Sequence, residues 1–204
     1  MPTQVIGVTR DLRVLWAAEE TGVLYRVKAL DYRRDLKARD YLKINPFAHI
    51  PSIDDNGFKL FESGAIVFYL ADKAKKLMPK DPGQRALARQ WAFAAVNTVE
   101  IGMAEVFFAG KFGSDAGWPK QRIAEYRKLI GAHLTALDGE LAKKPYLLGD
   151  DFTAPDILMT TVLRIIDFTR MIDNYPHLVS YKAQCESRPA WKKIFSEYQQ
   201  RLAA

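Results

Sequence analysis

The sequence predicts a small α/β domain followed by an all-helical domain. Three observations lead to this prediction: strand patterns are confined to the first third of the chain, the turn-rich stretch LMPKDPG follows them, and only helical patterns come after it. The chain has 204 residues, of which 49% are hydrophobic, and this is enough to bury the cores of one large or two small domains. The predicted domains are residues 1–77 and 85–204, joined by a linker at 78–84.

Strand and helix patterns alternate in the first domain. Residues 4–8 and 25–30 each favour a strand, and the segment DLRVLWAAEETG between them favours a helix that Asp11 caps at its start and Gly22 at its end. A short charged helix or turn is expected at 35–43. The segments IPSID and FKLF, joined by DNG, predict a β-hairpin, and SGAIVFYLADKAKK predicts an amphipathic helix directly after it.

The second domain is predicted to consist of helices alone. Residues 84–112 and 119–143 favour two long helices. Thr153 and Asp156 form the pattern of a capping box before another helix, and two prolines mark the starts of the last two helices. These prolines are Pro176 and Pro189.

Charge and composition argue against several classes of function. The net charge is +6, but basic and acidic residues are interleaved, as in RRDLKARD, so a nucleic-acid partner is not expected. The single cysteine, Cys185, excludes a disulfide within the chain, and we expect it to be buried and structural. No apolar run approaches the length of a membrane span, and the N-terminus lacks a signal-peptide pattern, so we expect a cytoplasmic protein without a membrane partner.

Residues 45–70, NPFAHIPSIDDNGFKLFESGAIVFYL, resemble a segment of the soluble glutathione transferases. That family reads NP-x-G-K-V-P-x-L and then L-x-E-S-x-A-I-x-x-Y-L. The segments TRDLRVLWAAEETG and FTAPDI are similar to the family's first turn and helix and to its capping box, so the resemblance covers nearly the whole chain.

The resemblance implies a thioredoxin-like βαβαββα domain followed by an α-helical bundle domain. It also implies a bacterial-like member of the serine/threonine type that forms a homodimer and serves in detoxification. The expected activity is conjugation of glutathione to small hydrophobic electrophiles. No metal and no cofactor are expected beyond glutathione as co-substrate. Two alternatives stay open on the same fold: a glutathione-dependent peroxidase or disulfide reductase, and a non-catalytic ligand-binding protein.

Four residues are candidates for the γ-glutamyl and cysteinyl parts of glutathione. If Pro51 is cis, as the resemblance implies, the backbone of Ile50 can pair with the cysteinyl part as an added strand does. Taken alone, Pro51 also fits an ordinary strand-opening proline. Glu62 and Ser63 begin a predicted helix, whose N-terminus favours an anion. Ser63 can donate to the γ-glutamyl carboxylate and Glu62 can pair with its ammonium, although Ser63 also fits a simple helix cap.

The glycine carboxylate of glutathione has two candidate partners. His49 occupies the position where the family often has a lysine, which is a departure because a neutral histidine binds an anion less well. Lys37 stands eight residues before Asn45, where some plant-type relatives place a lysine for this carboxylate. Either residue could bind it, and each could also be an ordinary surface residue.

The nucleophile would be the thiol of glutathione, of which little is ionised at pH 7 because its pKa is about 8.5. Family members lower this pKa with a tyrosine, serine or cysteine after the first strand. None of these occurs in the turn from Thr9 to Arg13, but Thr9 matches the serine-type spacing S-x-x-x-R. We therefore predict that the Thr9 hydroxyl donates to the sulfur and that Arg10 adds positive potential. Thr9 as an ordinary turn residue is the alternative.

Aromatic residues supply the remaining candidates. Four of them cluster at and just after the end of the predicted helix 84–112 and could form an apolar site for the electrophile, or could belong to the core. They are Phe107, Phe108, Phe112 and Trp118. Phe47, on the loop before Pro51, is predicted to insert into the partner subunit of the dimer, and the alternative is a ring folded back on its own domain.

Overall fold

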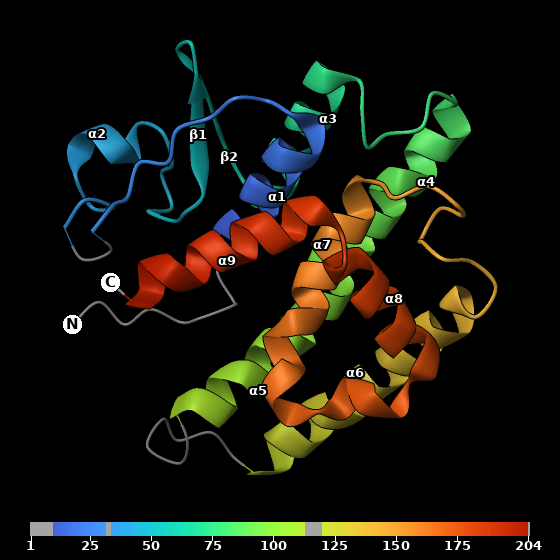
Figure 1. Ribbon diagram of the computed structural model, residues 1–204. Helices are drawn as coiled ribbons and strands as arrows, with labels where there is room; N and C mark the ends of the chain where they lie inside the picture. The colour runs from blue at the N-terminus through green and yellow to red at the C-terminus, as the bar shows by residue number, and fades with distance from the viewer. Residues whose placement is uncertain (1–9, 32–33, 113–119, 204) are drawn as a thin grey trace. The chain divides into compact units, whose positions relative to one another are not determined.

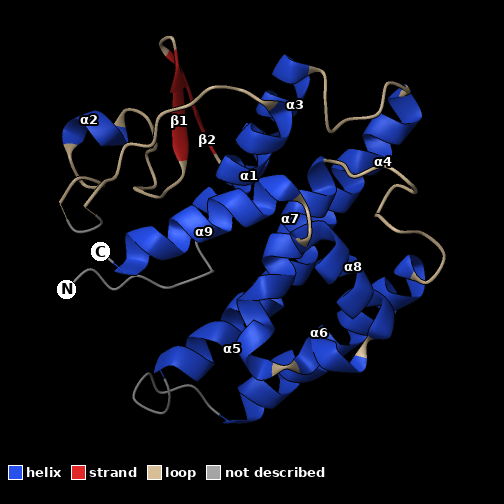
Figure 2. Cartoon of the chain, viewed as in Figure 1, coloured by secondary structure: helices blue, strands red, loops and turns tan. Residues whose placement is uncertain are grey.

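The computed structural model describes residues 10–31, 34–112 and 120–203 (Figures 1 and 2). The chain divides into two compact units, Met1–Met78 with Ala190–Ala204, and Pro79–Pro189. Figure 2 shows the described strands in the first unit and helices throughout the second, in keeping with an α/β domain and an all-helical one. The last helix groups with the first unit, whereas the sequence alone predicts a helical domain that continues to residue 204.

The first unit is built from a hairpin and the helices around it. In chain order the elements are α1 (Asp11–Thr21), α2 (Arg39–Leu42), β1 (Ser52–Asp55), β2 (Phe58–Phe61), α3 (Ser63–Ala74) and finally α9 (Pro189–Ala203). The two strands are antiparallel, and both residues of the connecting turn, Asn56 and Gly57, have positive φ angles of 54° and 92°. Such angles suit the tight turn that the DNG sequence favours, so the predicted hairpin is confirmed.

The sequence also predicts two strands in the first unit before the hairpin. The strand expected at 25–30 is wrong, because this segment has no regular structure and its neighbour Leu24 is 97% exposed. A strand needs a hydrogen-bonded neighbour, and within the described residues β1 and β2 pair only with each other. The other strand, expected at 4–8, lies outside the described residues.

The caps of α1 also differ in part from expectation. Arg10 is the N-cap residue and makes no side-chain capping bond, so the prediction that Asp11 caps the helix is wrong. Asp11 lies instead in the first helical turn, where its negative charge complements the helix dipole. Gly22 does end the helix, with a φ of 76° and an N–H that donates to the Ala18 carbonyl.

The core of the first unit lies between α1 and α3, which are in contact along one face each. Small and branched side chains on these faces are fully buried, among them Ala17, Val67 and Ala71. Helix α9 also contacts α1, where the centroid of the Trp191 ring lies 4.6 Å from that of the Trp16 ring and Lys193 bonds Glu19. Burial of large aromatic surfaces of this kind is a major source of stability.

The second unit consists of helices around a buried central helix. Its elements are α4 (Pro82–Phe93), a π-helical segment (Ala94–Val99), α5 (Glu100–Phe112), α6 (Lys120–Leu141), α7 (Ala154–Leu163), two 3-10 segments (Arg164–Thr169 and Met171–Asn174) and α8 (Pro176–Glu186). Every residue of α7 is buried. The helix starts predicted at Pro176 and Pro189 are confirmed.

The predicted capping box at the start of α7 is confirmed and extends into a buried network. Asp156 accepts hydrogen bonds from the Thr153 N–H and hydroxyl, from the Leu147 N–H and from the Tyr181 hydroxyl, at 2.8–3.0 Å. Burial raises the pKa of Asp156 more than these four bonds lower it. Cys185 is buried, as predicted, and burial raises the pKa of its thiol to about 12.

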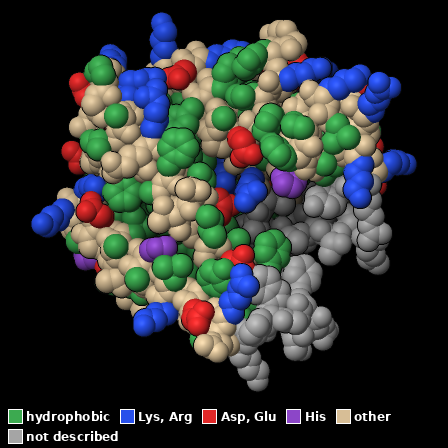
Figure 3. Space-filling view, turned by 180° about the vertical axis from the view of Figure 1, so that it is seen from behind, with side chains coloured by type: hydrophobic (Ala, Val, Ile, Leu, Met, Phe, Trp, Pro, Cys, Tyr) green, Lys and Arg blue, Asp and Glu red, His purple; other side chains and the backbone are tan. Residues whose placement is uncertain are grey.

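The continuous helix Pro82–Gly110 is long and apolar enough to cross a membrane by length and composition alone. Half of its most apolar window is buried inside the protein, as in the core helices of many soluble proteins, so this signal is weak. On the face drawn in Figure 3, basic side chains are interspersed with acidic and apolar ones. This distribution agrees with the interleaved charges of the sequence.

Candidate functional site

The candidate site begins at Ser63, the first residue of α3. Ser63 is 4% exposed, and its Oγ accepts a hydrogen bond of 3.2 Å from Nη1 of Arg13. Arg13 lies on α1 and is itself only 2% exposed. The positive end of the α3 dipole and a buried guanidinium thus meet at one hydroxyl, an arrangement that favours an anion.

Glu62, the N-cap of α3, has an unusual backbone. Its φ and ψ angles are 70° and 112°, and its side chain is exposed. A positive φ in a residue other than glycine costs on the order of 1 kcal/mol or more, and such residues concentrate at functional sites. The Ile66 N–H makes the first helical bond, to the Glu62 carbonyl, so the amides of residues 63–65 are the ones that have no partner within the helix.

The loop before β1 contains the second part of the site. The Ile50–Pro51 bond is cis, as the resemblance implies, and Ile50 is 37% exposed. The His49 side chain is exposed, but its backbone carbonyl accepts two hydrogen bonds, from the Tyr41 hydroxyl at 2.6 Å and from the Asn45 amide at 2.8 Å. Hydrogen bonds from Tyr41 and Asn45 therefore fix the backbone of this loop at His49.

The hairpin register brings these two parts together. Ser52 of β1 pairs with Phe61 of β2. Pro51 and Glu62, the residues that flank this pair, therefore lie at the same end of the hairpin. Four of the residues predicted to bind glutathione thus meet at one edge, at the N-terminus of α3. Lys37 lies in the turn before α2 and is exposed.

The sequence reasoning gave no binding role to three residues that shape this edge. The sequence analysis used Arg13 only as the arginine of the S-x-x-x-R spacing. A basic residue on an otherwise apolar helix face nevertheless indicates that a polar group lies opposite it. Asn45 lies in the NPFAHIP motif, and its burial at 2% indicates a structural hydrogen-bonding role. For Tyr41 the sequence offers no signal, because an aromatic residue in a short charged helix fits a core position equally well.

The residues predicted to activate the thiol are only partly described. Thr9 lies outside the described residues. Arg10 is exposed at the start of α1. The hydrogen bond from Thr9 to the sulfur of glutathione therefore stays a prediction.

The predicted aromatic site divides into buried and exposed members. Phe107 is 4% exposed and packs edge-to-face on Phe108 and on Phe168, with centroid distances of 5.5 and 5.9 Å. Phe108 and Phe168 are about half exposed. Phe112 is the last residue of α5, and Trp118 lies outside the described residues. Phe107 therefore belongs to the core, and Phe108 reaches the surface.

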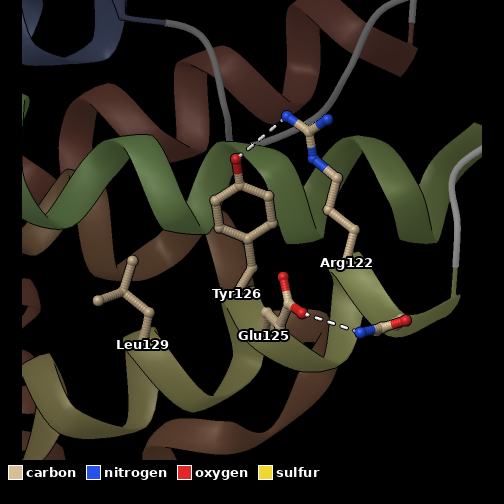
Figure 4. A pocket seen from close by; sticks show the side chains of 5 residues that line it. Arg122, Glu125, Tyr126 and Leu129 are labelled. Atoms are coloured by element: carbon tan, nitrogen blue, oxygen red, sulfur yellow. Dashed lines mark hydrogen bonds between the residues drawn. The ribbon is translucent and has the colours of Figure 1, made fainter.

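Helix α6 lines an open cavity of about 540 Å³ with Gln121, Arg122, Glu125, Tyr126 and Leu129 (Figure 4). Its polar groups satisfy one another in part, because Arg122 bonds the Tyr126 hydroxyl and Gln121 bonds Glu125. The described residues that line this cavity include none of those predicted from the sequence. Within the described part of the chain, no group of three or more His, Cys, Asp or Glu residues could hold a metal ion.

Comparison with known proteins identifies the family. Residues 4–72 match the glutathione S-transferase N-terminal domain, and residues 102–189 match the glutathione S-transferase C-terminal domain. A glutathione S-transferase from Hyoscyamus muticus is 30% identical over an alignment of 206 positions, gaps included, that covers 93% of this chain and 93% of that one. The chain belongs to the glutathione S-transferase family.

Two solved structures of relatives contain the expected ligand. A glutathione transferase family member from Pseudomonas fluorescens, with two glutathione molecules bound, is 26% identical with a TM-score of 0.84, over 93% of this chain and 89% of that one. A glutathione transferase from Burkholderia graminis holds two glutathione molecules per subunit and is also 26% identical, with a TM-score of 0.85 over 93% and 85% of the two chains. The thioredoxin-like fold of the first domain, with a helical domain after it, is thereby confirmed.

Proposed function

We propose that the protein is a glutathione transferase that conjugates glutathione to small hydrophobic electrophiles. The observation that carries the proposal is the buried Ser63 hydroxyl, which lies at the N-terminus of α3, bonded to Arg13 and beside the exposed Glu62. This arrangement offers an anion site next to a carboxylate. The γ-glutamyl end of glutathione carries the complementary carboxylate and ammonium on one carbon.

The cysteinyl and glycine parts of glutathione would bind along the end of the hairpin that carries Pro51 and Glu62. With the γ-glutamyl group at Ser63 and Glu62, the cysteinyl backbone would pair with Ile50 at the same end of the hairpin. The glycine carboxylate would then reach His49 or Lys37, whose side chains are both exposed.

In the proposed reaction the Thr9 hydroxyl donates a hydrogen bond to the glutathione sulfur and Arg10 adds positive potential, so that the thiol loses its proton to solvent. The thiolate attacks the electrophilic carbon, a C–S bond forms, and the leaving group departs with the bonding electron pair. Phe108 would contact the electrophile at the surface, with Phe112 and Trp118. Catalysis rests on positioning and thiol activation, in a cytoplasmic homodimer with a role in detoxification.

A second candidate function is glutathione-dependent reduction of disulfides or peroxides. Two relatives hold two glutathione molecules, which favours this candidate. One thiolate would attack the disulfide and release one thiol, and the second glutathione would then resolve the mixed disulfide to give oxidised glutathione and the second thiol. Cys185 is buried, so both reacting thiols would come from glutathione.

The test begins with calorimetric titration of glutathione into the protein. We expect glutathione to bind with micromolar to millimolar affinity, and correctly folded protein that binds no glutathione would exclude both enzymatic proposals. Turnover of an aryl halide would support the transferase. Turnover of a hydroperoxide or of bis(2-hydroxyethyl) disulfide, without turnover of the aryl halide, would support the reductase, and binding without any turnover would support a ligand-binding protein.

A further inference from the structure

The Tyr41 hydroxyl bridges the two sides of the turn at Pro51. It donates a hydrogen bond of 2.6 Å to the His49 carbonyl, two residues before the proline. It accepts a bond of 3.1 Å from the Ser52 hydroxyl, one residue after the proline. Tyr41 is 8% exposed, so these bonds form in a largely water-excluded position where hydrogen bonds are electrostatically stronger than in water.

Asn45 completes the arrangement from the same side. Its amide donates to the same His49 carbonyl at 2.8 Å, so both lone pairs of that oxygen are used. Its Oδ1 accepts the Phe47 N–H at 3.0 Å, and its own carbonyl accepts the Ala48 N–H at 3.1 Å. The loop is thus held by Tyr41 of α2 and by Asn45, which bonds Phe47, Ala48 and His49; Ala48 has a positive φ of 55°.

We propose that Tyr41 is a positioning residue for glutathione, and that it acts through the backbone of residues 49–52. This inference rests on the proposed function. The bonds from Tyr41 and from the Asn45 amide engage the His49 carbonyl rather than the His49 side chain, and Tyr41 also accepts the bond from Ser52. The His49 side chain and Ile50 stay exposed and can therefore contact the ligand. Because hydrogen bonds fix the backbone that carries them, these groups are oriented before the ligand arrives. A ligand that binds an ordered loop does not have to order it, and its affinity is correspondingly higher.

The decisive variant is Tyr41→Phe, which keeps the ring and removes only the hydroxyl. We expect the dissociation constant for glutathione to rise about three- to tenfold, the effect of one hydrogen bond to a backbone carbonyl. In the conjugation assay the KM for glutathione should rise, while kcat at saturating glutathione and the KM for the electrophile stay unchanged. Ser52→Ala should act in the same direction, and the double variant should be less than additive because both changes remove one chain of bonds.

Tyr175→Phe is a matched control. The Tyr175 hydroxyl also donates to a backbone carbonyl, that of Gly131 at 3.2 Å, but it lies in the second unit. This variant should leave the affinity for glutathione unchanged. Hydrogen exchange of the free proteins provides a readout that needs no ligand: in Tyr41→Phe the amides of Phe47 and Ala48 should exchange faster, while the amides of α3 keep their protection.

The outcomes separate the two proposals. Wild-type protein that binds no glutathione would overturn the proposed function and the role of Tyr41 with it. Wild-type protein that binds glutathione no better than Tyr41→Phe would overturn the positioning role alone. An equal loss of affinity in Tyr175→Phe would also overturn it, because the effect would then be one of general stability.

Discussion

The guanidinium of Arg13 donates a hydrogen bond of 3.2 Å to the hydroxyl of Ser63, and both side chains are buried. This bond joins α1 to the first residue of α3. The same hydroxyl can donate its own proton outward, because a serine oxygen accepts and donates at once. Arg13 thus orients the group that we expect to meet the γ-glutamyl carboxylate.

Ser63→Ala should therefore weaken glutathione binding. The loss should be about 1–3 kcal/mol, the cost of leaving a charged group without its hydrogen bond. Calorimetric titration measures it directly. Ser187→Ala is a suitable control, since the Ser187 hydroxyl is exposed and bonds only the nearby Gln184 carbonyl among the contacts of its side chain described here. A Ser63→Ala protein with the wild-type dissociation constant would remove this residue from the site.

Thr9 supports a prediction about the sulfur itself. Thr9→Ala should raise the pKa of the thiol of bound glutathione, because the thiolate loses a hydrogen bond, and Thr9→Ser should keep it near the wild-type value. The absorbance of the thiolate, titrated against pH in the binary complex, gives this pKa. If the alanine variant titrates like the wild type, backbone amides or Arg10 must activate the sulfur instead.

The sequence predicts much of this fold because its signals are local. The DNG turn, the prolines that begin α8 and α9, and the capping box of Thr153 each act through residues a few positions away. The strand expected at 25–30 failed for the opposite reason, since a strand depends on a partner distant in the sequence. The hydrogen bonds from Arg13 to Ser63 and from Tyr41 to His49 likewise depend on tertiary packing, and no spacing rule reveals them.

His49 provides a test of where the glycine end of glutathione lies. If its side chain meets the glycine carboxylate, His49→Lys should bind glutathione about two- to fivefold more tightly, because a full positive charge at an exposed position adds a modest ion-pair energy. The dipeptide γ-glutamylcysteine, which lacks the glycine, should bind both proteins equally. Lys37→Gln tests the other candidate in the same way: a loss of affinity for glutathione, but not for the dipeptide, would assign the carboxylate to Lys37.

The buried Cys185 should react only slowly with thiol reagents in the folded protein. Burial raises the pKa of its thiol from 9.0 to about 12, so the reactive thiolate is scarce at pH 8. An aromatic disulfide reagent should therefore modify it slowly in the native state and rapidly in denaturant, with Cys185→Ala as the blank. Because the thiol ionises near pH 9 in the unfolded chain and near pH 12 in the folded one, its contribution to the free energy of unfolding falls as pH rises between these values. Native protein that reacts as fast as a free thiol would contradict the burial.

The last prediction concerns Phe47 and the expected homodimer. Phe47 lies on the loop before β1 and is 64% exposed, and its ring touches only the edge of Phe61 among the ring contacts described, at a centroid distance of 6.0 Å. Neither alternative from the sequence describes it fully, because the ring leans on its own unit and still presents most of its surface. A large exposed aromatic side chain on a loop held by Asn45 and Tyr41 is well suited to insert into a partner subunit.

Phe47→Ala should weaken the dimer by about 2–4 kcal/mol if the ring is a buried anchor in the interface. Phe168→Ala is a matched control: this ring is 53% exposed and packs in a T-shaped contact on Phe107, with a centroid distance of 5.9 Å. Sedimentation velocity over a series of falling concentrations should show monomers of Phe47→Ala at concentrations where the wild type and Phe168→Ala remain dimeric. The Phe47 variant should also bind glutathione less tightly, because the same loop carries His49 and Ile50. A Phe47→Ala protein that stays as dimeric as the wild type down to nanomolar concentration would show that the ring is not the anchor, and that the interface depends on other surfaces.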